Sequence, residues 1–315
     1  MTFPVHAAPI AATAQRFAPI DFVSGSSECS DRQIYGTRIA RTDVHFDQPM
    51  DLVAAKPLQR TIVSAQQYLP KPQRTPDIIG SGWLGQALRG FRCWVEASGQ
   101  TVCFDDGAGF WVSADGSCVE AFALPADAAL REELLLGPAL LLALAQRGVF
   151  GLHASAILGN AGAVLLLGPS GSGKSTLARH ALGEGGLRLA DDVAPVWLAA
   201  NGPRLLPRFP QLKLSPALCV DDLELPVAAM IWVEIGEGAL AMTQLGQTEV
   251  SRCLLRDSVA ARLFTPALLA RHLDTCAALA MSIPGWRVLV PRAAPEQRAG
   301  VIHSAYQLLR VHGLP

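Results

Sequence analysis

The chain has 315 residues, of which 50% are hydrophobic, and 26 basic against 27 acidic residues leave a net charge of −1. This length suggests two domains, and the hydrophobic content is enough for a large core. The balanced charge excludes the basic excess that is typical of nucleic-acid binding. The longest apolar stretch, Leu134–Ala145, contains Gly137 and Pro138 and is too short to cross a bilayer, so no membrane span is predicted.

The cysteines and the N-terminus favour a cytoplasmic location. The seven cysteines form no C-x-x-C pair, and Cys93, Cys103 and Cys118 are too widely spaced for a zinc knuckle. Reduced thiols with a structural role are therefore expected. No basic segment followed by a long apolar run stands at the N-terminus, so no secretory signal is predicted.

The first part of the chain is predicted to be an irregular segment, residues 1–58, followed by a small β-rich domain, residues 59–126. Residues 1–58 are rich in Ala and Pro and show no clear period apart from an expected strand at Gln33–Arg41. After a proline-rich loop at Pro70–Pro76, short aromatic and β-branched runs are separated by Gly-containing turns, which predicts a β-meander. Its strands are expected at Phe91–Ala97, Thr101–Phe104, Phe110–Ser113 and Cys118–Phe122.

Residues 127–315 are predicted to form an α/β domain, because strand and helix patterns alternate from Asp127 onward. Asp127–Arg147 is a leucine-rich helix with a bend at Gly137-Pro138. Further strands are expected at Phe150–Leu158, Ala163–Leu167, Leu187–Ala190, Val193–Leu198, Ala228–Ile235 and Trp286–Val290, with Ala239–Leu245 pairing with Ala228–Ile235. Further helices are expected from Thr176, over Thr248–Ala261, from Thr265-Pro266 to Ala280, and over Pro295–Val311.

A phosphate-binding loop follows the strand Ala163–Leu167. Gly168, Gly173, Lys174 and Ser175 fill the fixed places of the pattern G-x-x-x-x-G-K-[ST]. Glycines let the backbone approach a phosphate closely, and the N-terminus of the following helix favours an anion. ATP is therefore the expected ligand, with Lys174 reaching its β- and γ-phosphates and the Ser175 hydroxyl binding Mg²⁺. The residues expected to bind the nucleotide are Gly168, Ser170, Gly171, Ser172, Gly173, Lys174, Ser175 and Thr176.

Two more features lie near this loop in the sequence: His153 in the preceding strand, and Asp191-Asp192 at the end of the next strand. Ligands of open α/β sheets bind beyond the carboxyl ends of strands, so these residues are expected to converge. A carboxylate beside a phosphate loop can hold Mg²⁺, and a second one can accept the proton of an attacking hydroxyl. The pattern therefore indicates phosphoryl transfer.

The motifs Leu152–Ala156, Gly168–Leu177 and Leu189–Asp192 resemble those of the HPr serine kinase family, and more narrowly the HPr-kinase-related proteins that include serine kinases of lasso-peptide precursors. The resemblance extends from about Leu130 to the C-terminus. It implies a phosphate-loop α/β fold related to phosphoenolpyruvate carboxykinase and ATP-dependent phosphorylation of a serine in a peptide or protein. It also implies roles for three residues: Asp191 as the catalytic base, Asp192 as the Mg²⁺-linked acid and His153 as the histidine near the acceptor.

Several alternatives stay open. The glycine- and arginine-rich signature of true HPr kinases is missing from Asn201–Pro216 and Ser251–Arg262, so an acceptor other than HPr is expected. A small-molecule kinase acting on a sugar or nucleoside would share the nucleotide site, and a nucleotide-gated binding module would need no catalytic base. The acceptor, assembly into a homo-oligomer, and a role for Arg252, Arg256 or Arg262 in phosphoryl transfer are not decided by the sequence.

Overall fold

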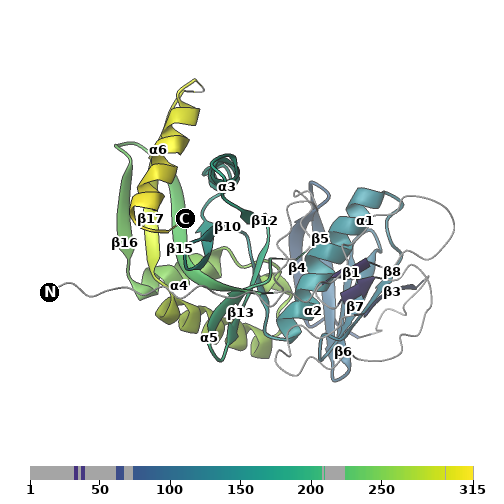
Figure 1. Ribbon diagram of the computed structural model, residues 1–315. Helices are drawn as coiled ribbons and strands as arrows, with labels where there is room; N and C mark the ends of the chain where they lie inside the picture. The colour runs from purple at the N-terminus through teal and green to yellow at the C-terminus, as the bar shows by residue number, and fades with distance from the viewer. Residues whose placement is uncertain are drawn as a thin grey trace.

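A computed structural model of the chain describes residues 74–207, 209, 224–294 and 296–314, together with the backbone of three short strands at 32–34, 37–39 and 62–66. The remainder of the predicted irregular segment 1–58 and most of Pro207–Pro216 lie outside the described residues. Within the described part, no helix is long and apolar enough to cross a membrane. The chain forms two β-sheets with helices packed on them (Figure 1).

The first sheet contains eight described strands in the order β1-β2-β3-β8-β7-β6-β5-β4. The strands are β1 (Arg32–Ile34), β2 (Thr37–Ile39), β3 (Ile62–Gln66), β4 (Ile78–Leu84), β5 (Ala87–Glu96), β6 (Gly99–Phe104), β7 (Gly109–Ser113) and β8 (Cys118–Phe122). Strands β4 to β8 pair antiparallel in chain order, which confirms the predicted meander and adds β4 to it. The strand expected at Gln33–Arg41 is instead the hairpin of β1 and β2.

The second sheet contains nine described strands and is mixed, with β11 parallel to β15 and β15 parallel to β17. Its strands are β9 (Phe150–Leu152), β10 (Ser155–Gly159), β11 (Gly162–Leu167), β12 (Arg188–Asp191), β13 (Ala194–Ala199), β14 (Gly202–Leu205), β15 (Leu225–Gly236), β16 (Ala241–Leu245) and β17 (Gly285–Pro291). The long strand β15 pairs first with β14 and then with β11 and β17, and so joins the two ends of the sheet.

The helices that accompany these sheets are α1 (Ala128–Leu134), the π-helical turn η2 (Leu135–Ala139), α2 (Leu140–Gln146), α3 (Lys174–Gly183), α4 (Gln247–Arg256), the 3₁₀ turn η4 (Ala261–Leu263), α5 (Pro266–Ser282) and α6 (Arg298–Val311). The expected bend lies at Gly137, whose backbone leaves helical geometry before Pro138. The expected start of α5 is also confirmed, since the Thr265 hydroxyl accepts the N–H of Leu268 at 3.2 Å.

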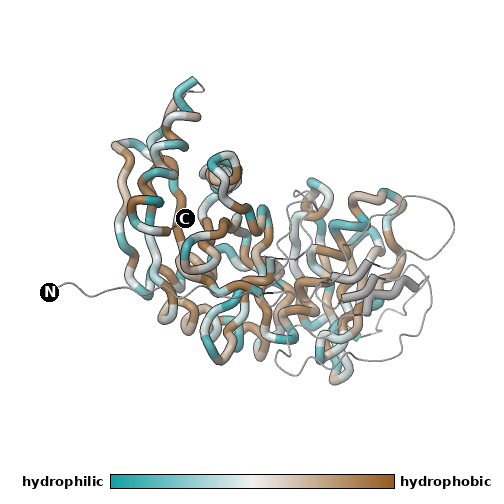
Figure 2. The backbone as a smooth tube through the Cα atoms, in the orientation of Figure 1, coloured by the Kyte–Doolittle hydropathy of each residue, from teal (hydrophilic) through white to brown (hydrophobic). Residues whose placement is uncertain are grey.

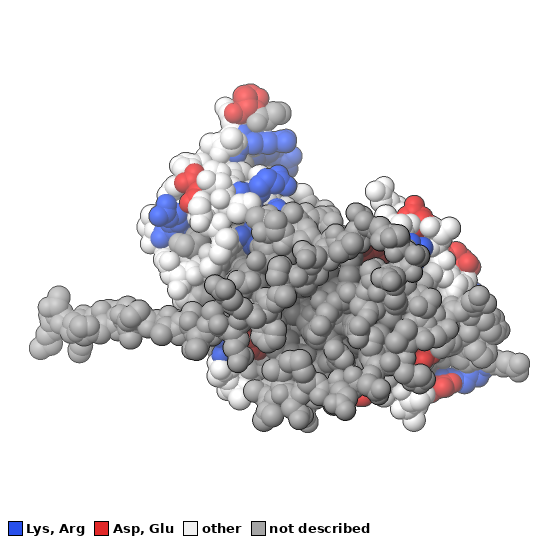
Figure 3. All heavy atoms as spheres, turned by 45° about the vertical axis from the view of Figure 1, so that its right-hand side comes forward, with Lys and Arg blue, Asp and Glu red and all other residues white. Residues whose placement is uncertain are grey.

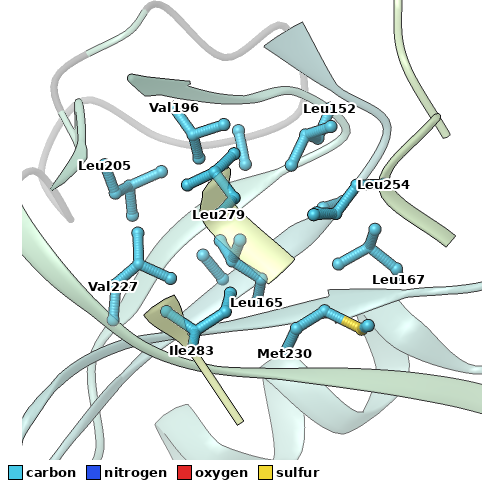
Figure 4. Close-up of a cluster of buried hydrophobic side chains, with 14 of the residues drawn as sticks. Leu152, Leu165, Leu167, Val196, Leu205, Val227, Met230, Leu254, Leu279 and Ile283 are labelled. Carbon is cyan, nitrogen blue, oxygen red and sulfur yellow. The ribbon is translucent and has the colours of Figure 1, made fainter. Parts of the chain in front are cut away.

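Helices cover both faces of the second sheet (Figure 1). On one face, Leu165 of β11 and Met230 of β15 pack with α4 and α5 in the cluster drawn in Figure 4. On the other face, Leu166 and Ile231 pack with α3 and α6. Adjacent residues of a strand point to opposite faces, so the continuous apolar runs of β11 and β15 supply both layers. Figure 2 shows this hydrophobic centre, with a hydrophilic outer end of α6. The mixed α/β class is therefore confirmed.

Helices α1 and α2 and the first sheet share one hydrophobic cluster. It joins Phe110 and Val119 of the sheet with Leu134 and Leu142 of the helices, and it also includes Phe264 from the segment before α5. Hydrogen bonds cross the same contact: the Gln100 amide donates to the Leu263 carbonyl at 2.5 Å, and the Arg262 guanidinium donates to the Ser81 carbonyl at 2.6 Å. The first sheet therefore packs directly against segments of residues 127–315.

Two predictions about the second sheet are wrong. Phe150–Leu158 is two strands with a break at His153, because β9 pairs with β13 while β10 pairs with β11 and β12. Strand β16 pairs with β17 and not with β15, because β15 already has β11 on one side and β17 on the other. Turn signals identify the strands here, but they do not identify the partner of each strand.

Candidate active site

The loop between β11 and α3 is held in a strained backbone path that depends on glycine. Gly168, Gly171 and Gly173 have φ angles of 138°, 79° and 96°. A Cβ atom on Gly168 would lie 2.2 Å from the carbonyl oxygen of Val233, whereas no atom of the described residues lies within 4 Å of one on Gly171. The predicted strand, loop and helix are therefore present, and Gly168 is the glycine that the packing itself requires.

The side chains of the loop differ in how they are held. The Lys174 ammonium is buried and donates to the carbonyls of Gly168 at 2.6 Å and Pro169 at 3.1 Å, so it lies across the loop. The Ser172 hydroxyl is buried and has no hydrogen-bond partner within the described residues. Ser175 in the first turn of α3 is half-buried, and Ser170 and Thr176 are exposed. An unpaired buried hydroxyl is costly, which makes the loop a place where an oxyanion would supply a missing partner.

Asp191 and Asp192 face different surroundings. Asp191 ends β12, and its buried carboxylate accepts from the Ser155 hydroxyl at 2.9 Å and from the Arg188 guanidinium at 3.1 Å. Asp192 follows with a φ of 113°, and its side chain is 28% exposed. Its carboxylate lies 3.5 Å from Nδ1 of His153. The structure therefore brings Asp192 and His153 together and holds Asp191 in a separate buried pair.

His153 lies in a bend at the break between β9 and β10. Its backbone N–H donates to the carbonyl of Asp257 at 2.6 Å, and the neighbouring Leu152 forms a β-bridge with Ser258. The imidazole is 43% exposed. The loop after α4 therefore places Asp257 beside His153, although the two are far apart in the sequence.

Asp257 is a site residue that the sequence analysis missed. Its carboxylate accepts the backbone N–H of Gly168, the first residue of the loop, at 2.9 Å. Burial raises the pKa of this carboxyl, and the Gly168 N–H, the Lys174 ammonium and His153 oppose the rise. Asp257 follows a strongly amphipathic helix and stands in no motif. Only its position after the last turn of α4 could have drawn attention to it.

A cavity of about 590 Å³ lies beside the loop on the α4 side of the sheet. Loop residues Pro169–Ser172 form one wall, and Arg252, Arg256 and Arg287 project from α4 and β17. The Arg256 guanidinium lies over the Trp232 ring, 5.1 Å from its centre. Arg262 is not part of this cavity, because its guanidinium binds the first sheet at Ser81. The sequence does not decide whether Arg252, Arg256 or Arg262 assists phosphoryl transfer. Of these three, Arg252 and Arg256 line the cavity.

A second cavity, of about 450 Å³, lies on the α3 and α6 side of the same loop. Gly173 and Thr176 line it, together with Ile302, Arg292 and Arg298. Figure 3 shows Lys and Arg side chains gathered in the upper part of the molecule, the part that carries α6 in Figure 1. The loop thus separates two cavities, one on each face of the sheet.

Comparisons with known proteins find similarity among solved structures alone. No family model and no curated protein match the sequence. A solved structure described as the Hpr(Ser) kinase/phosphatase from Coxiella burnetii is similar to this chain, with 13% identity and a TM-score of 0.30, over 51% of this chain and 91% of that one. A TM-score this low identifies neither a fold nor an activity. The predicted fold of the HPr kinase and phosphoenolpyruvate carboxykinase type therefore stays a prediction.

Proposed function

We propose that the protein is an ATP-dependent kinase that transfers the γ-phosphoryl group to a hydroxyl. The observation that carries this proposal is that Asp257 binds both Gly168 and His153. Its carboxylate accepts the Gly168 N–H, and its backbone carbonyl accepts the His153 N–H. Through these two contacts, the phosphate loop and the His153–Asp192 pair form one site. A phosphate loop next to an accessible carboxylate and imidazole has the groups that phosphoryl transfer needs, namely positioning, charge stabilisation and proton acceptance.

The nucleotide fits the loop and the second cavity. The unpaired Ser172 hydroxyl and the Lys174 ammonium are suited to phosphate oxygens. Thr176 and Ile302 line the second cavity next to the last residues of the loop, so we place the nucleoside there, with its apolar base against α6. The Ser175 hydroxyl in the first turn of α3 offers an oxygen ligand of the kind that Mg²⁺ prefers. When bound, Mg²⁺ would offset charge on the phosphate oxygens.

The acceptor hydroxyl would enter from the side of His153 and the first cavity. A general base has to reach the hydroxyl, and Asp192 is the more exposed of the two acids. We therefore propose Asp192 as the base, with His153 beside it, and Asp191 as a positioning residue that fixes the end of β12 through Ser155 and Arg188. The family resemblance implies Asp191 as the base, so this proposal moves the base by one residue, to Asp192.

The reaction proposed for this site is balanced. The acceptor oxygen bonds to the γ-phosphorus, the bond from the γ-phosphorus to the β,γ-bridging oxygen breaks, and ADP leaves. The hydroxyl proton passes to the carboxylate. Arg252 and Arg256, which project into the cavity beside the loop, are placed to interact with the negative charge on the transferred group.

We propose a serine of a peptide or protein as the acceptor, with a lasso-peptide precursor as one candidate. Strand β4 supports this choice, because it is the last strand of the described first sheet and exposes Ile79 and Trp83 at 72% and 74%. Extended peptides commonly bind by adding to such an edge. A sugar or nucleoside kinase is the alternative for the acceptor, and a nucleotide-gated binding module is the alternative without catalysis.

The test is phosphorylation of candidate precursor peptides by the full chain with ATP and Mg²⁺, followed by mass spectrometry. We expect one phosphate on a serine. Lys174→Ala should abolish transfer, because it removes the ammonium that we propose binds the phosphates, while Arg179→Ala, an exposed change on the same helix, should keep it. Transfer to sugars or nucleosides alone would favour the small-molecule kinase, and equal activity of parent and Lys174→Ala would contradict any phosphate-loop chemistry.

A further inference from the structure

Three metal-binding side chains meet on the surface where α3 packs against α6. His180 lies in the last turn of α3, and Glu184 follows one turn later as the residue that ends the helix. His303 lies on α6. One nitrogen of each imidazole and one carboxylate oxygen lie within 4.8 Å of one another. All three side chains are partly exposed, at 26% for His180, 35% for Glu184 and 50% for His303, so an ion can reach them from solvent.

The three atoms form a nearly regular triangle. Nε2 of His180 is 3.2 Å from Nδ1 of His303, and Oε1 of Glu184 is 3.7 Å from the first atom and 3.8 Å from the second. Tetrahedral zinc with bonds of about 2.0–2.1 Å requires ligand atoms about 3.4 Å apart. Small side-chain adjustments would therefore bring all three atoms to bonding distance from one ion, with the fourth position open to water.

We propose that His180, Glu184 and His303 form a zinc site that clamps α3 to α6. Two imidazoles and one carboxylate are ligands typical of Zn²⁺, whereas Mg²⁺ and Ca²⁺ prefer oxygen ligands. The site is distinct from the candidate active site, since it shares no residue with the His153–Asp192 pair. It uses no residue of the phosphate loop or of the acid pair.

The position of this zinc site links it to the second cavity. Helix α3 begins at Lys174 in the phosphate loop, and Val301 and Ile302, which precede His303 on α6, line the cavity. Below the surface, Leu177 and Ala181 of α3 already pack with Tyr306 of α6. A bound ion would crosslink α3 and α6 at the outer edge of this contact. Both helices line the second cavity, so the ion would fix two of its walls relative to each other.

The experiment measures Zn²⁺ binding to the untagged, metal-stripped full chain by competition with a chromophoric chelator, with thermal melting in parallel. We expect His303→Ala and His180→Ala to lose one Zn²⁺ equivalent or to bind it at least about 100-fold more weakly, since even the loss of an outer-shell partner costs about 10–100-fold. Zn²⁺ should raise the melting temperature of the parent but not that of these variants.

Two controls make the result specific. His312→Ala removes another histidine at the end of α6, and His153→Ala removes the active-site histidine; both should bind Zn²⁺ as the parent does. All variants share the seven cysteines, so binding by thiols is common to them. If His180→Ala melts differently without zinc, Glu184→Gln, a change at a partly exposed position, replaces it. Equal stoichiometry and affinity in parent, His303→Ala and Glu184→Gln would overturn the proposal, whatever the kinase assay shows.

Discussion

The two adjacent acids have opposite surroundings, and this difference predicts different losses when each is changed. Asp192→Asn should lower turnover by about 10²–10⁴-fold with little change in melting temperature, because Asp192 is half-buried and is the proposed base. Asp191→Asn should instead lower the melting temperature, because it leaves the buried Arg188 guanidinium without its anionic partner.

Turnover measured against Mg²⁺ concentration, together with thermal melting, distinguishes these roles. A higher Mg²⁺ requirement in Asp192→Asn alone would assign that residue to the metal, as the resemblance implies. A loss of turnover in Asp191→Asn with unchanged stability would return the base to Asp191. If neither variant loses more than a few-fold in turnover, a nucleotide-gated binding module becomes the better account.

His272 predicts a pH dependence of stability. The ring is buried against Phe150, with Nε2 2.6 Å from the Ser258 hydroxyl, and burial lowers its pKa to about 4 from 6.5. Between these values the unfolded chain binds a proton that the folded chain does not, so the free energy of unfolding falls as pH falls from 6.5 toward 4. The loss is on the order of 3 kcal/mol at 1.36 kcal/mol for each pKa unit.

Denaturant unfolding at several pH values measures this effect. His272→Gln keeps a polar side chain but cannot titrate, so its stability should change less between pH 6.5 and 4 than that of the parent. His312→Gln, at the end of α6, is the matched change and should follow the parent. Parallel pH profiles for the parent and His272→Gln would show that this histidine does not govern the acid sensitivity.

At the scale of elements, the path of the phosphate loop predicts unequal effects of adding one methyl group. In Gly168→Ala the new Cβ would collide with the Val233 carbonyl, so β11 or β15 has to move, and both stability and nucleotide binding should fall. Gly171→Ala has open space and only the cost of a left-handed residue, about 1–2 kcal/mol. Thermal melting and nucleotide titration should rank Gly168→Ala as the more damaged. The reverse order would contradict the packing argument.

The sequence predicts most elements because their signals are local. The proline-bent helix, the capped start of α5 and the glycine-separated meander each depend on a few adjacent residues. Pairing of distant strands leaves no such signal, so the partner that the sequence predicts for β16 is wrong. Likewise Lys174 is recognised from its motif, whereas Asp257 reaches Gly168 only through the packing of α4.

At the scale of the whole molecule, the shared hydrophobic cluster predicts that residues 127–314 depend on the first sheet. A fragment that begins at Ala126 would expose Leu134, Leu142 and Phe264, which are now buried against that sheet. We expect the fragment to melt at a lower temperature than the full chain and to aggregate at higher concentration. Calorimetry and light scattering of both proteins test this.

Nucleotide binding by that fragment is a separate measurement, because the loop and both cavities lie in residues that it keeps. We expect a folded fragment to bind ATP while its activity on a peptide acceptor falls. A fragment as stable as the full chain would mean that the shared cluster contributes little, and a folded fragment without nucleotide affinity would contradict the proposed site.

The parallel pairing of β11 with β15 and of β15 with β17 also bears on the order of synthesis. Val164 pairs with Ala229, and Val233 pairs with Val288, so the centre of the second sheet cannot close until the chain is nearly complete. Contacts so distant in sequence form slowly. An apolar strand is prone to aggregate until its pairing partner has been synthesised. A nascent chain halted before β17 therefore leaves Ile231–Val233 of β15 without a partner on one edge. Its survival should depend on chaperones that bind apolar strands until β17 emerges.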